Sequence, residues 1–252
     1  MSVLSVVIPA YNEAKTISLI LDQLLNLQFT TPVTLEIIIV NDASQDRTLE
    51  VIERYNQERE VLKILTNGTN LGKSQSVRRG ILATTGDYVV IQDADLEYNP
   101  ENLVFMHQQM LEGGFDVCYG NRFGKNNGMI YPKNFYGNLL LSFFSNLFTI
   151  GRINVSIPDM EVCYKMVRGD ILREVAQTIE SRSNFGFEPE VTAKLSRYKK
   201  KSPETETSAP SFLVLPVDYR PRTYEEGKKM KAFRDGFKAL VEIVRYNTQN
   251  RD

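Results

Sequence analysis

Three acidic side chains stand at alternating positions where a largely apolar run of the chain ends. Residues 88–91 form the run, and Asp93, Asp95 and Glu97 follow it. While the chain stays extended, side chains two positions apart point to the same side, so these carboxylates would converge. Crowded carboxylates are costly unless a cation or a shared proton neutralises them. Because oxygen ligands of this kind suit Mg²⁺ or Mn²⁺, the segment predicts a metal site with positions open for substrate phosphate.

The acidic segment and residues 68–74 each have another interpretation. The alternative for the acidic segment is that Asp93 ends a strand and the other acids belong to an ordinary loop. A calcium-binding loop is disfavoured, since Tyr98 and Val104 stand where that loop needs glycine and glutamate. Residues 68–74 approach a phosphate-binding P-loop, but they have three residues between the glycines where the motif has four.

The composition is ordinary for a soluble globular protein: 252 residues, 42% hydrophobic, 24% charged and a net charge of −1. That length fits one large α/β domain. The nearly neutral charge gives no support for nucleic-acid binding. Cys118 and Cys163 lie far apart without metal-ligand spacing, so both are expected to be reduced, as in a cytosolic protein. His107 is the single histidine, which excludes chemistry that requires two.

The beginning of the chain and its hydropathy bear on its location. Residues 1–9 have no basic region and no cleavage site, so a first strand is expected rather than a signal peptide. No stretch reaches the ~18 consecutive apolar residues that cross a bilayer. We therefore expect a chain that is soluble or attached at most to a membrane surface.

Strand-like apolar runs alternate with helical patterns. The expected strands cover residues 4–8, 35–40, 61–65, 88–91, 116–119 and 212–217. The expected helices cover residues 14–27, 46–57, 73–83, 100–111, 132–150 and 229–246. This order is typical of an α/β fold with a mostly parallel sheet and helices on both faces. Ligands bind such sheets beyond the carboxyl ends of the strands, and the polar clusters at 9–13, 41–44, 67–73 and 93–97 all follow expected strands.

The second half is less regular. The helix expected at 132–150 has a polar stripe made of Asn138, Ser142, Ser145, Asn146 and Thr149. Its remaining face is apolar, with Leu139, Leu140, Phe143, Phe144, Leu147 and Phe148. That apolar face fits either a membrane surface or packing in the core or a dimer. Residues 198–210 are polar and predict a mobile surface loop.

Several short motifs occur in a specific order over residues 4–246. The first half contains 6–13, 36–46, 70–73 and the Asp93-Ala94-Asp95-Leu96 stretch. The second half contains 120–122, 159–165, 187–190 and 221–229. Together they resemble the family-2 glycosyltransferases, and within them the dolichyl-phosphate mannosyltransferase-like branch that uses polyprenyl phosphates. The resemblance implies a single domain, residues 1–252, with the GT-A (nucleotide-diphospho-sugar transferase) fold.

The resemblance also implies an activity. It is that of an inverting, Mg²⁺- or Mn²⁺-dependent hexosyltransferase with a nucleotide-sugar donor, such as GDP-mannose or UDP-glucose. The acceptor would be a polyprenyl phosphate, reached by peripheral attachment to the cytoplasmic face of a membrane. A homo-oligomer is compatible with this reading. Two alternatives stay open: a family-2 transferase with a soluble or glycan acceptor, and a non-catalytic sugar-nucleotide-binding protein.

The same resemblance implies roles for individual residues. The donor nucleoside would be held by Pro9, Tyr11, Glu13 and Asp42, with Asp42 facing the base. The ribose and diphosphate would lie near Lys73 and Asp93. The metal would be carried by Asp95 and Glu97, beside Asp93. The acceptor phosphate would be bound by Arg122, Lys133 and Arg222.

Asp159 matches a late acidic position of the family that is sometimes considered a catalytic base. A phosphomonoester has a second pKa of about 6 and is largely ionised at neutral pH. We therefore expect Asp159 to orient or assist the acceptor.

Overall fold

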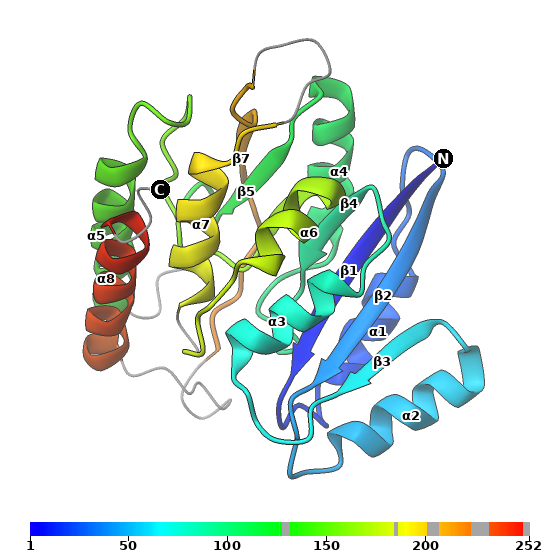
Figure 1. The fold of residues 1–252 in the computed structure, drawn as a ribbon. Coiled ribbons are helices and arrows are strands. Elements are labelled where there is room, and N and C mark those ends of the chain that lie inside the picture. The colour runs from blue at the N-terminus through cyan, green and yellow to red at the C-terminus, as the bar shows by residue number, and fades with distance from the viewer. Residues whose placement is uncertain (126, 128–131, 184–185, 201–206, 223–231, 249–252) are drawn as a thin grey trace.

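A computed structural model describes residues 1–125, 127, 132–183, 186–200, 207–222 and 232–248 (Figure 1). The predicted mobile loop at 198–210 lies in part outside the described residues. In the order of the sheet, the strands are β3 (Leu62–Thr66), β2 (Val33–Asn41), β1 (Ser2–Ala10), β4 (Tyr88–Ile91), β6 (Lys165–Arg168), β5 (Val117–Asn121) and β7 (Phe212–Pro216).

The sheet is mostly parallel, as predicted. β1 pairs in parallel with β2 and β4, β2 with β3, and β5 with β7. β6 is antiparallel to both of its neighbours, β4 and β5. The central strands are buried and apolar, with Val6, Val7 and Ile8 in β1 fully inaccessible. A strand buried on both faces reads as a continuous apolar run, which is why these strands were readily recognised.

Helices cover both faces of the sheet. They are α1 (Ile17–Leu25), α2 (Thr48–Arg59), α3 (Lys73–Leu82), α4 (Glu101–Gly113), α5 (Pro132–Thr149), α6 (Gly169–Gln177), α7 (Phe187–Arg197) and α8 (Ala232–Thr248). Figure 1 shows α3 and α6 in front of the sheet and α1 behind it. The His107 ring of α4 contacts Phe29, just after α1, with ring centroids 5.7 Å apart. The α/β class with helices on both faces is therefore confirmed.

The region between α5 and residue 198 contains elements that the sequence pattern does not predict. The structure has β6, α6 and α7 there. β6 is only four residues long and has a basic residue at each end, Lys165 and Arg168. Its apolar run is therefore too short to be recognised as a strand from the sequence. α7 carries Pro189 in its first turn, a position that a helix tolerates but that sequence patterns usually read as a break.

The orientation of α5 could not be read from its sequence. Three residues of its polar stripe, Ser142, Ser145 and Thr149, are buried at 3% exposure or less. Tyr136, Leu140, Phe143 and Leu147 are instead more than half exposed. The polar stripe faces inward because it binds backbone groups of the segment after α5: the Met160 amide donates to Ser142 Oγ (2.9 Å).

Candidate active site

The carboxyl ends of the first three strands bring predicted polar clusters together. The amide of Asp42, after β2, donates to the carbonyl of Ala10 at the end of β1 (2.9 Å). The amide of Asn67, after β3, donates to the carbonyl of Asn41 (2.9 Å). The loops that follow β1, β2 and β3 are therefore tied side by side at one edge of the sheet.

Asp42 is buried and holds the loop that leads into α3. Its Oδ1 accepts the Leu71 amide (2.8 Å) and the Asn67 Nδ2 (2.7 Å), and its Oδ2 accepts the Gly72 amide (2.8 Å). Gly72 has φ of +84°, a conformation that glycine adopts at little cost. Asp42 thus positions the loop that delivers Lys73 at the start of α3.

Lys73 lies between two carboxylates. Its Nζ is 3.0 Å from Asp93 Oδ1 and 3.2 Å from Glu188 Oε1. Burial alone would raise the pKa of Asp93, but the nearby Lys73 ammonium lowers it below its usual value. Burial would likewise lower the pKa of Lys73, and Asp93 and Glu188 raise it well above its usual value. The Lys73–Asp93 pair is therefore ionised.

The acidic segment does not continue β4 as an extended strand, contrary to the assumption behind its predicted convergence. β4 ends at Ile91, and Leu96 has φ of +63°, a left-handed conformation that is strained for a non-glycine residue. The three carboxylates have different partners. Asp93 pairs with Lys73, whereas Asp95 and Glu97 both contact a residue that is distant in the chain, Arg222.

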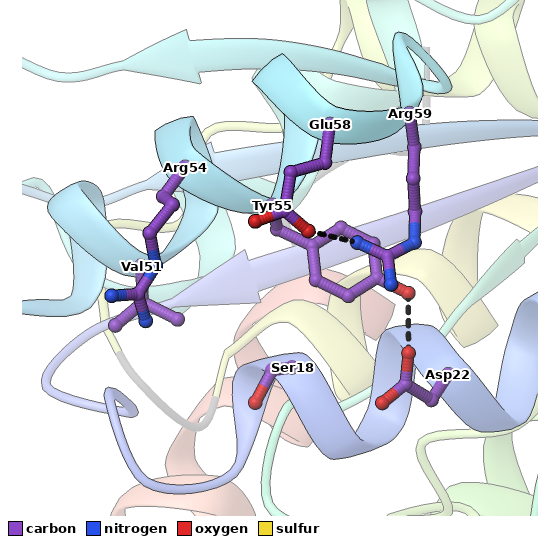
Figure 2. Close-up of a pocket in the computed structure, with 7 residues that line it drawn as sticks. All are labelled: Ser18, Asp22, Val51, Arg54, Tyr55, Glu58 and Arg59. Carbon is purple, nitrogen blue, oxygen red and sulfur yellow. Dashed lines mark hydrogen bonds and ion pairs between the residues drawn. The ribbon is translucent and has the colours of Figure 1, made fainter.

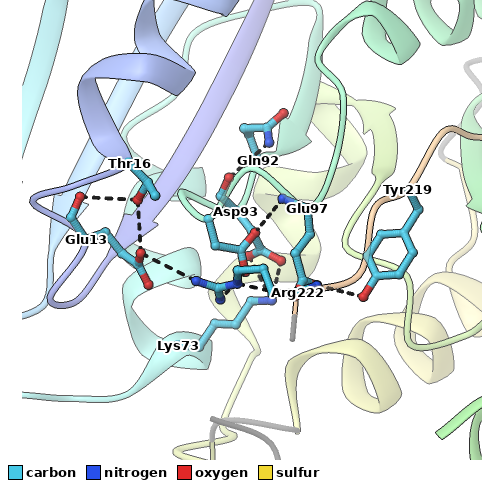
Figure 3. Close-up of polar contacts among 9 residues, drawn as sticks. Glu13, Thr16, Lys73, Gln92, Asp93, Glu97, Tyr219 and Arg222 are labelled. Atoms are coloured by element: carbon cyan, nitrogen blue, oxygen red, sulfur yellow. Dashed lines mark hydrogen bonds and ion pairs between the residues drawn. The ribbon is translucent and has the colours of Figure 1, made fainter. Parts of the chain in front are cut away.

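Arg222 occupies the space between the acidic side chains (Figure 3). Its Nη2 lies 2.7 Å from Asp95 Oδ2, and its Nε lies 3.3 Å from Glu97 Oε1. Its Nη1 lies 3.9 Å from Glu13 Oε2. Despite this guanidinium, burial and the negative charges of Asp93 and Glu97 raise the pKa of Asp95 to about 7. The local charge balance therefore favours an additional cation.

Asp93, Asp95 and Glu97 supply carboxylate oxygens, the ligand type that Mg²⁺ and Mn²⁺ prefer. In the part of the chain that the structure describes, no group of three or more His, Cys, Asp or Glu side chains is arranged around a common metal position. Of the predicted ligands, Asp95 and Glu97 share the Arg222 contact, and Asp93 faces Lys73. The oxygen ligands therefore fit a divalent ion chemically. In this structure, however, the Arg222 guanidinium contacts Asp95 and Glu97 in the place where such an ion would bind.

Arg122 and Asp159, assigned separately to the acceptor phosphate and to catalysis, form one buried ion pair. The guanidinium donates from Nε to Asp159 Oδ2 and from Nη2 to Oδ1, both at 2.7 Å, and the Arg122 amide adds a hydrogen bond of 3.0 Å. Asp159 has no exposed surface. Both carboxylate oxygens are thus engaged by Arg122, a geometry that suits orientation better than proton transfer.

Three ionisable residues near this pair have no role in the sequence-based prediction, two of them buried (Glu188 and Lys165) and one half-buried (Glu161). Glu188, Glu161 and Lys165 all belong to the 159–165 and 187–190 motifs, so the signal was present. Glu161 Oε1 is buried without a hydrogen-bond partner among the described residues. Burial, followed by the charge of Glu188, raises the pKa of Glu161 to about 8, and burial lowers the pKa of Lys165.

Three of the remaining predicted residues lie at or just after the end of β1. Pro9 and Tyr11, at the end of β1, are half-buried, as is Glu13. Glu13 accepts a hydrogen bond from Thr16 Oγ1 (3.0 Å) through its carboxylate. The side chain of Lys133 lies outside the described residues.

A separate shallow pocket lies between α1 and α2 (Figure 2). The hydroxyl of Tyr55 donates to Asp22 Oδ1 (2.7 Å), and the Arg59 guanidinium stacks 4.2 Å above the Tyr55 ring. None of the predicted site residues lines this pocket. The pocket is therefore separate from the site at the strand ends.

Similar proteins in solved structures support the fold. Mannosyl-3-phosphoglycerate synthase from Rubrobacter xylanophilus superimposes with a TM-score of 0.68 at 19% identity, covering 98% of this chain and 73% of that one. Glucosyl-3-phosphoglycerate synthase from Mycobacterium tuberculosis, solved with Mn²⁺, UDP and phosphoglyceric acid, gives 0.62 at 17% identity, covering 98% and 79%. The predicted GT-A fold is confirmed.

Sequence relatives point to the same family. An uncharacterized glycosyltransferase of Synechocystis is 30% identical over 184 residues, which is 72% of this chain and 55% of the relative. A dolichyl-phosphate beta-glucosyltransferase of Trichomonas vaginalis is 39% identical over 97 residues (36% and 30%). A dodecaprenyl-phosphate galacturonate synthase of Rhizobium johnstonii is 26% identical over 174 residues (68% and 49%). The chain thus spans about half or less of the length of these relatives.

The profile of the family "Glycosyl transferase family 2" matches residues 5–176. The match begins in β1 and includes the Asp42 loop, Lys73, the acidic segment and the Arg122–Asp159 pair. Because it covers more than half of the chain, these findings lead to one conclusion: the protein belongs to glycosyl transferase family 2.

Proposed function

We propose that this protein transfers a hexose from a nucleotide-diphosphate sugar to a polyprenyl phosphate, with inversion at the sugar. The observation that carries the proposal is the charged arrangement at the strand ends. Lys73 and Arg222 flank the carboxylates of Asp93, Asp95 and Glu97, next to the buried Arg122–Asp159 pair. Two sequence relatives are named for polyprenyl-phosphate substrates, a dolichyl-phosphate glucosyltransferase and a dodecaprenyl-phosphate galacturonate synthase.

For the donor, the proposal assigns the nucleoside to the loops after β1 and β2, and the diphosphate to the region around Lys73. The nucleoside-binding residues would be Pro9, Tyr11, Glu13 and Asp42. Asp95 and Glu97, with Asp93 nearby, would hold Mg²⁺ or Mn²⁺. A bound divalent ion would neutralise negative charge on the leaving nucleoside diphosphate, and the Lys73 ammonium would act in the same direction.

For the acceptor, the proposal assigns phosphate binding to Arg122, Lys133 and Arg222, because arginine suits bidentate contacts with phosphate. Asp159 would hold Arg122 in position for that contact. A phosphate acceptor that is already ionised needs placement more than deprotonation, which is consistent with the engaged carboxylate of Asp159.

An exposed apolar surface on α5 and α8 favours an acceptor in a lipid layer. The two helices pack side by side (Figure 1). We call this surface the apolar platform; its residues, each between 43% and 78% exposed, are Tyr136, Leu140, Phe143, Leu147, Ile150, Phe237, Val241 and Val244. The chain has no acidic residue between Asp116 and Asp159. Of the basic residues there, Arg122 and Lys125 pair with Asp159 and Asp218, and Lys133 and Arg152 add positive charge. Apolar contact combined with positive charge suits an anionic bilayer surface.

Peripheral attachment is the mode of membrane contact that this platform would provide. Within the described ranges, no helix combines the length and the apolar character needed to pass through a bilayer. The platform would lie on the cytoplasmic face, where nucleotide sugars and the proposed acceptor meet. The competing role for the same surface is contact with a second copy of the chain.

Vesicle binding distinguishes these two roles. We expect the protein to float with vesicles that contain anionic lipid, and Leu140→Glu/Phe143→Glu to reduce the bound fraction by about fivefold or more, because charges enter the apolar contact. Phe105→Glu/Leu111→Glu, which alters exposed apolar residues of α4, is the matched control and should float normally. Loss of self-association without vesicle binding would instead assign the platform to a dimer.

The function itself is tested by transfer of labelled sugar into lipid that is extracted with organic solvent. GDP-mannose and UDP-glucose are offered separately with dolichyl or undecaprenyl phosphate, in Mn²⁺, in Mg²⁺ and after chelation. We expect lipid product from one donor and loss of product on chelation. A soluble phosphate acceptor such as phosphoglyceric acid forms a parallel assay. Product only there would replace the lipid acceptor, and silence with every donor would favour a non-catalytic nucleotide-sugar-binding protein.

A further inference from the structure

The carboxylate oxygens of Asp95 and Glu97 are all occupied by donors of the protein itself. Asp95 Oδ1 accepts the amide of Glu97 (3.1 Å), and its Oδ2 accepts Arg222 Nη2 (2.7 Å). Glu97 Oε1 accepts the amide and Nε of Arg222 (3.1 and 3.3 Å), and its Oε2 accepts the hydroxyl of Tyr219 (2.6 Å). A cation that binds these oxygens therefore competes with the Arg222 guanidinium for the same negative charge.

The backbone of residues 218–220, which holds Arg222 in this position, is itself fixed by hydrogen bonds. The Arg220 amide donates to the carbonyl of Glu97 (2.7 Å), and Tyr219 forms a β-bridge with Tyr98. Four residues earlier than Arg222, the Asp218 amide donates to Asn102 Oδ1 (2.9 Å). The stretch after β7 is therefore fastened along the acidic segment. The side chains of Arg222, Asp95 and Glu97 are each 20% exposed or less, so solvent screens their charges only in part.

We propose that Arg222 is an internal counter-ion that competes with the divalent cation for Asp95 and Glu97. This inference rests on the proposed function, which assigns the cation to these residues. Without nucleotide, the guanidinium satisfies the two carboxylates and the cation binds weakly. A nucleoside diphosphate supplies additional oxygens for the cation and a first phosphate partner for the guanidinium, since arginine binds phosphate well. The acceptor phosphate assigned to Arg222 above would then share the same guanidinium, which has five N–H donors. Cation and donor therefore bind cooperatively, and Arg222 links them.

The competition is measured by Mn²⁺ binding, with electron paramagnetic resonance of free Mn²⁺ as the readout. Arg222→Gln removes the charge and keeps a hydrogen-bonding side chain, and Arg222→Lys keeps the charge. In the absence of nucleotide, we expect Arg222→Gln to bind Mn²⁺ about tenfold more tightly than the unmodified protein, because a positive charge next to the ion has been removed. Arg222→Lys should remain within about threefold. The matched control is Arg47→Gln, which removes an exposed arginine of equal charge at the start of α2 and should change nothing.

Addition of UDP or GDP completes the test. The nucleotide should tighten Mn²⁺ binding strongly in the unmodified protein and much less in Arg222→Gln, since the competitor is already gone. Equal or weaker Mn²⁺ binding by Arg222→Gln would overturn the role of Arg222. If Asp95→Asn abolishes that same binding, the proposed metal site still stands. Mn²⁺ binding that is absent, or insensitive to Asp95→Asn, would overturn the metal site and this inference together.

Discussion

Asp95→Asn is expected to lower sugar transfer by about three orders of magnitude while the fold remains intact. The amide keeps the shape of the carboxylate and still accepts a hydrogen bond from Arg222, but it removes the charge that the proposed cation requires. Loss of a cation worth roughly 4 kcal/mol to the transition state corresponds to about a 10³-fold decrease in rate. Transfer assays at saturating Mn²⁺ provide the measurement. Asp170→Asn, an exposed carboxylate paired with Arg168, is the control and should retain full activity.

Asp95 should also make Mn²⁺ affinity and folding stability depend on pH. The pKa of Asp95 is raised to about 7 from a usual value of 3.8, so the folded protein holds this proton where the unfolded chain has lost it. Mn²⁺ affinity should therefore rise between about pH 6 and about pH 8, as the carboxylate ionises. The contribution of Asp95 to folding stability falls as pH rises from about 4 to about 7. Asp95→Asn should accordingly gain stability relative to the unmodified protein over that interval. Mn²⁺ affinity that is flat across the upper range would contradict this assignment.

The parts of the fold that the sequence predicts well are those that apolar burial determines locally. The sequence pattern predicts β4 at the residues that it occupies, 88–91, because this apolar run is buried on both faces of the sheet. α1 buries Ile17, Ile20, Leu21 and Leu24, which recur at the spacing of one helix face. The polar clusters at the strand ends follow from the parallel arrangement alone. Boundaries differed by a few residues where caps and turns decide them.

The parts that could not be predicted depend on contacts between distant residues. Arg222 contacts Asp95 across 127 positions of the chain, and no local pattern marks it as the partner of an acidic cluster. The inward polar stripe of α5 depends likewise on what it binds: Asn146 pairs with both backbone groups of Ile157. A stripe of small polar residues reads as solvent-facing unless that partner segment is known.

Arg122→Met is expected to destabilise the protein by about 3–5 kcal/mol, the largest effect on stability that we predict. It would leave the charge of Asp159, which has no exposed surface, without its partner, and an unpaired buried charge carries that order of cost. Asp159→Asn should cost less, because the Arg122 side chain that it leaves unpaired is 12% exposed and the amide oxygen still accepts one hydrogen bond from the guanidinium. The double variant Arg122→Met/Asp159→Leu should be more stable than Arg122→Met alone, since it removes both charges. Urea unfolding of the four proteins measures these differences, and an unchanged Arg122→Met would refute the buried pair.

The ion pair also makes a specific prediction about mechanism. If Asp159 positions Arg122 for the acceptor phosphate, Asp159→Asn should lower turnover by roughly 10–100-fold, as loss of a supporting contact typically does. The shape of the pH–rate profile should stay the same, because a residue that only positions Arg122 takes no part in proton transfer. Loss of one limb of that profile would make Asp159 a general base. Near-normal turnover would remove it from the mechanism, and the role of Arg122 would then rest on its own contact with phosphate.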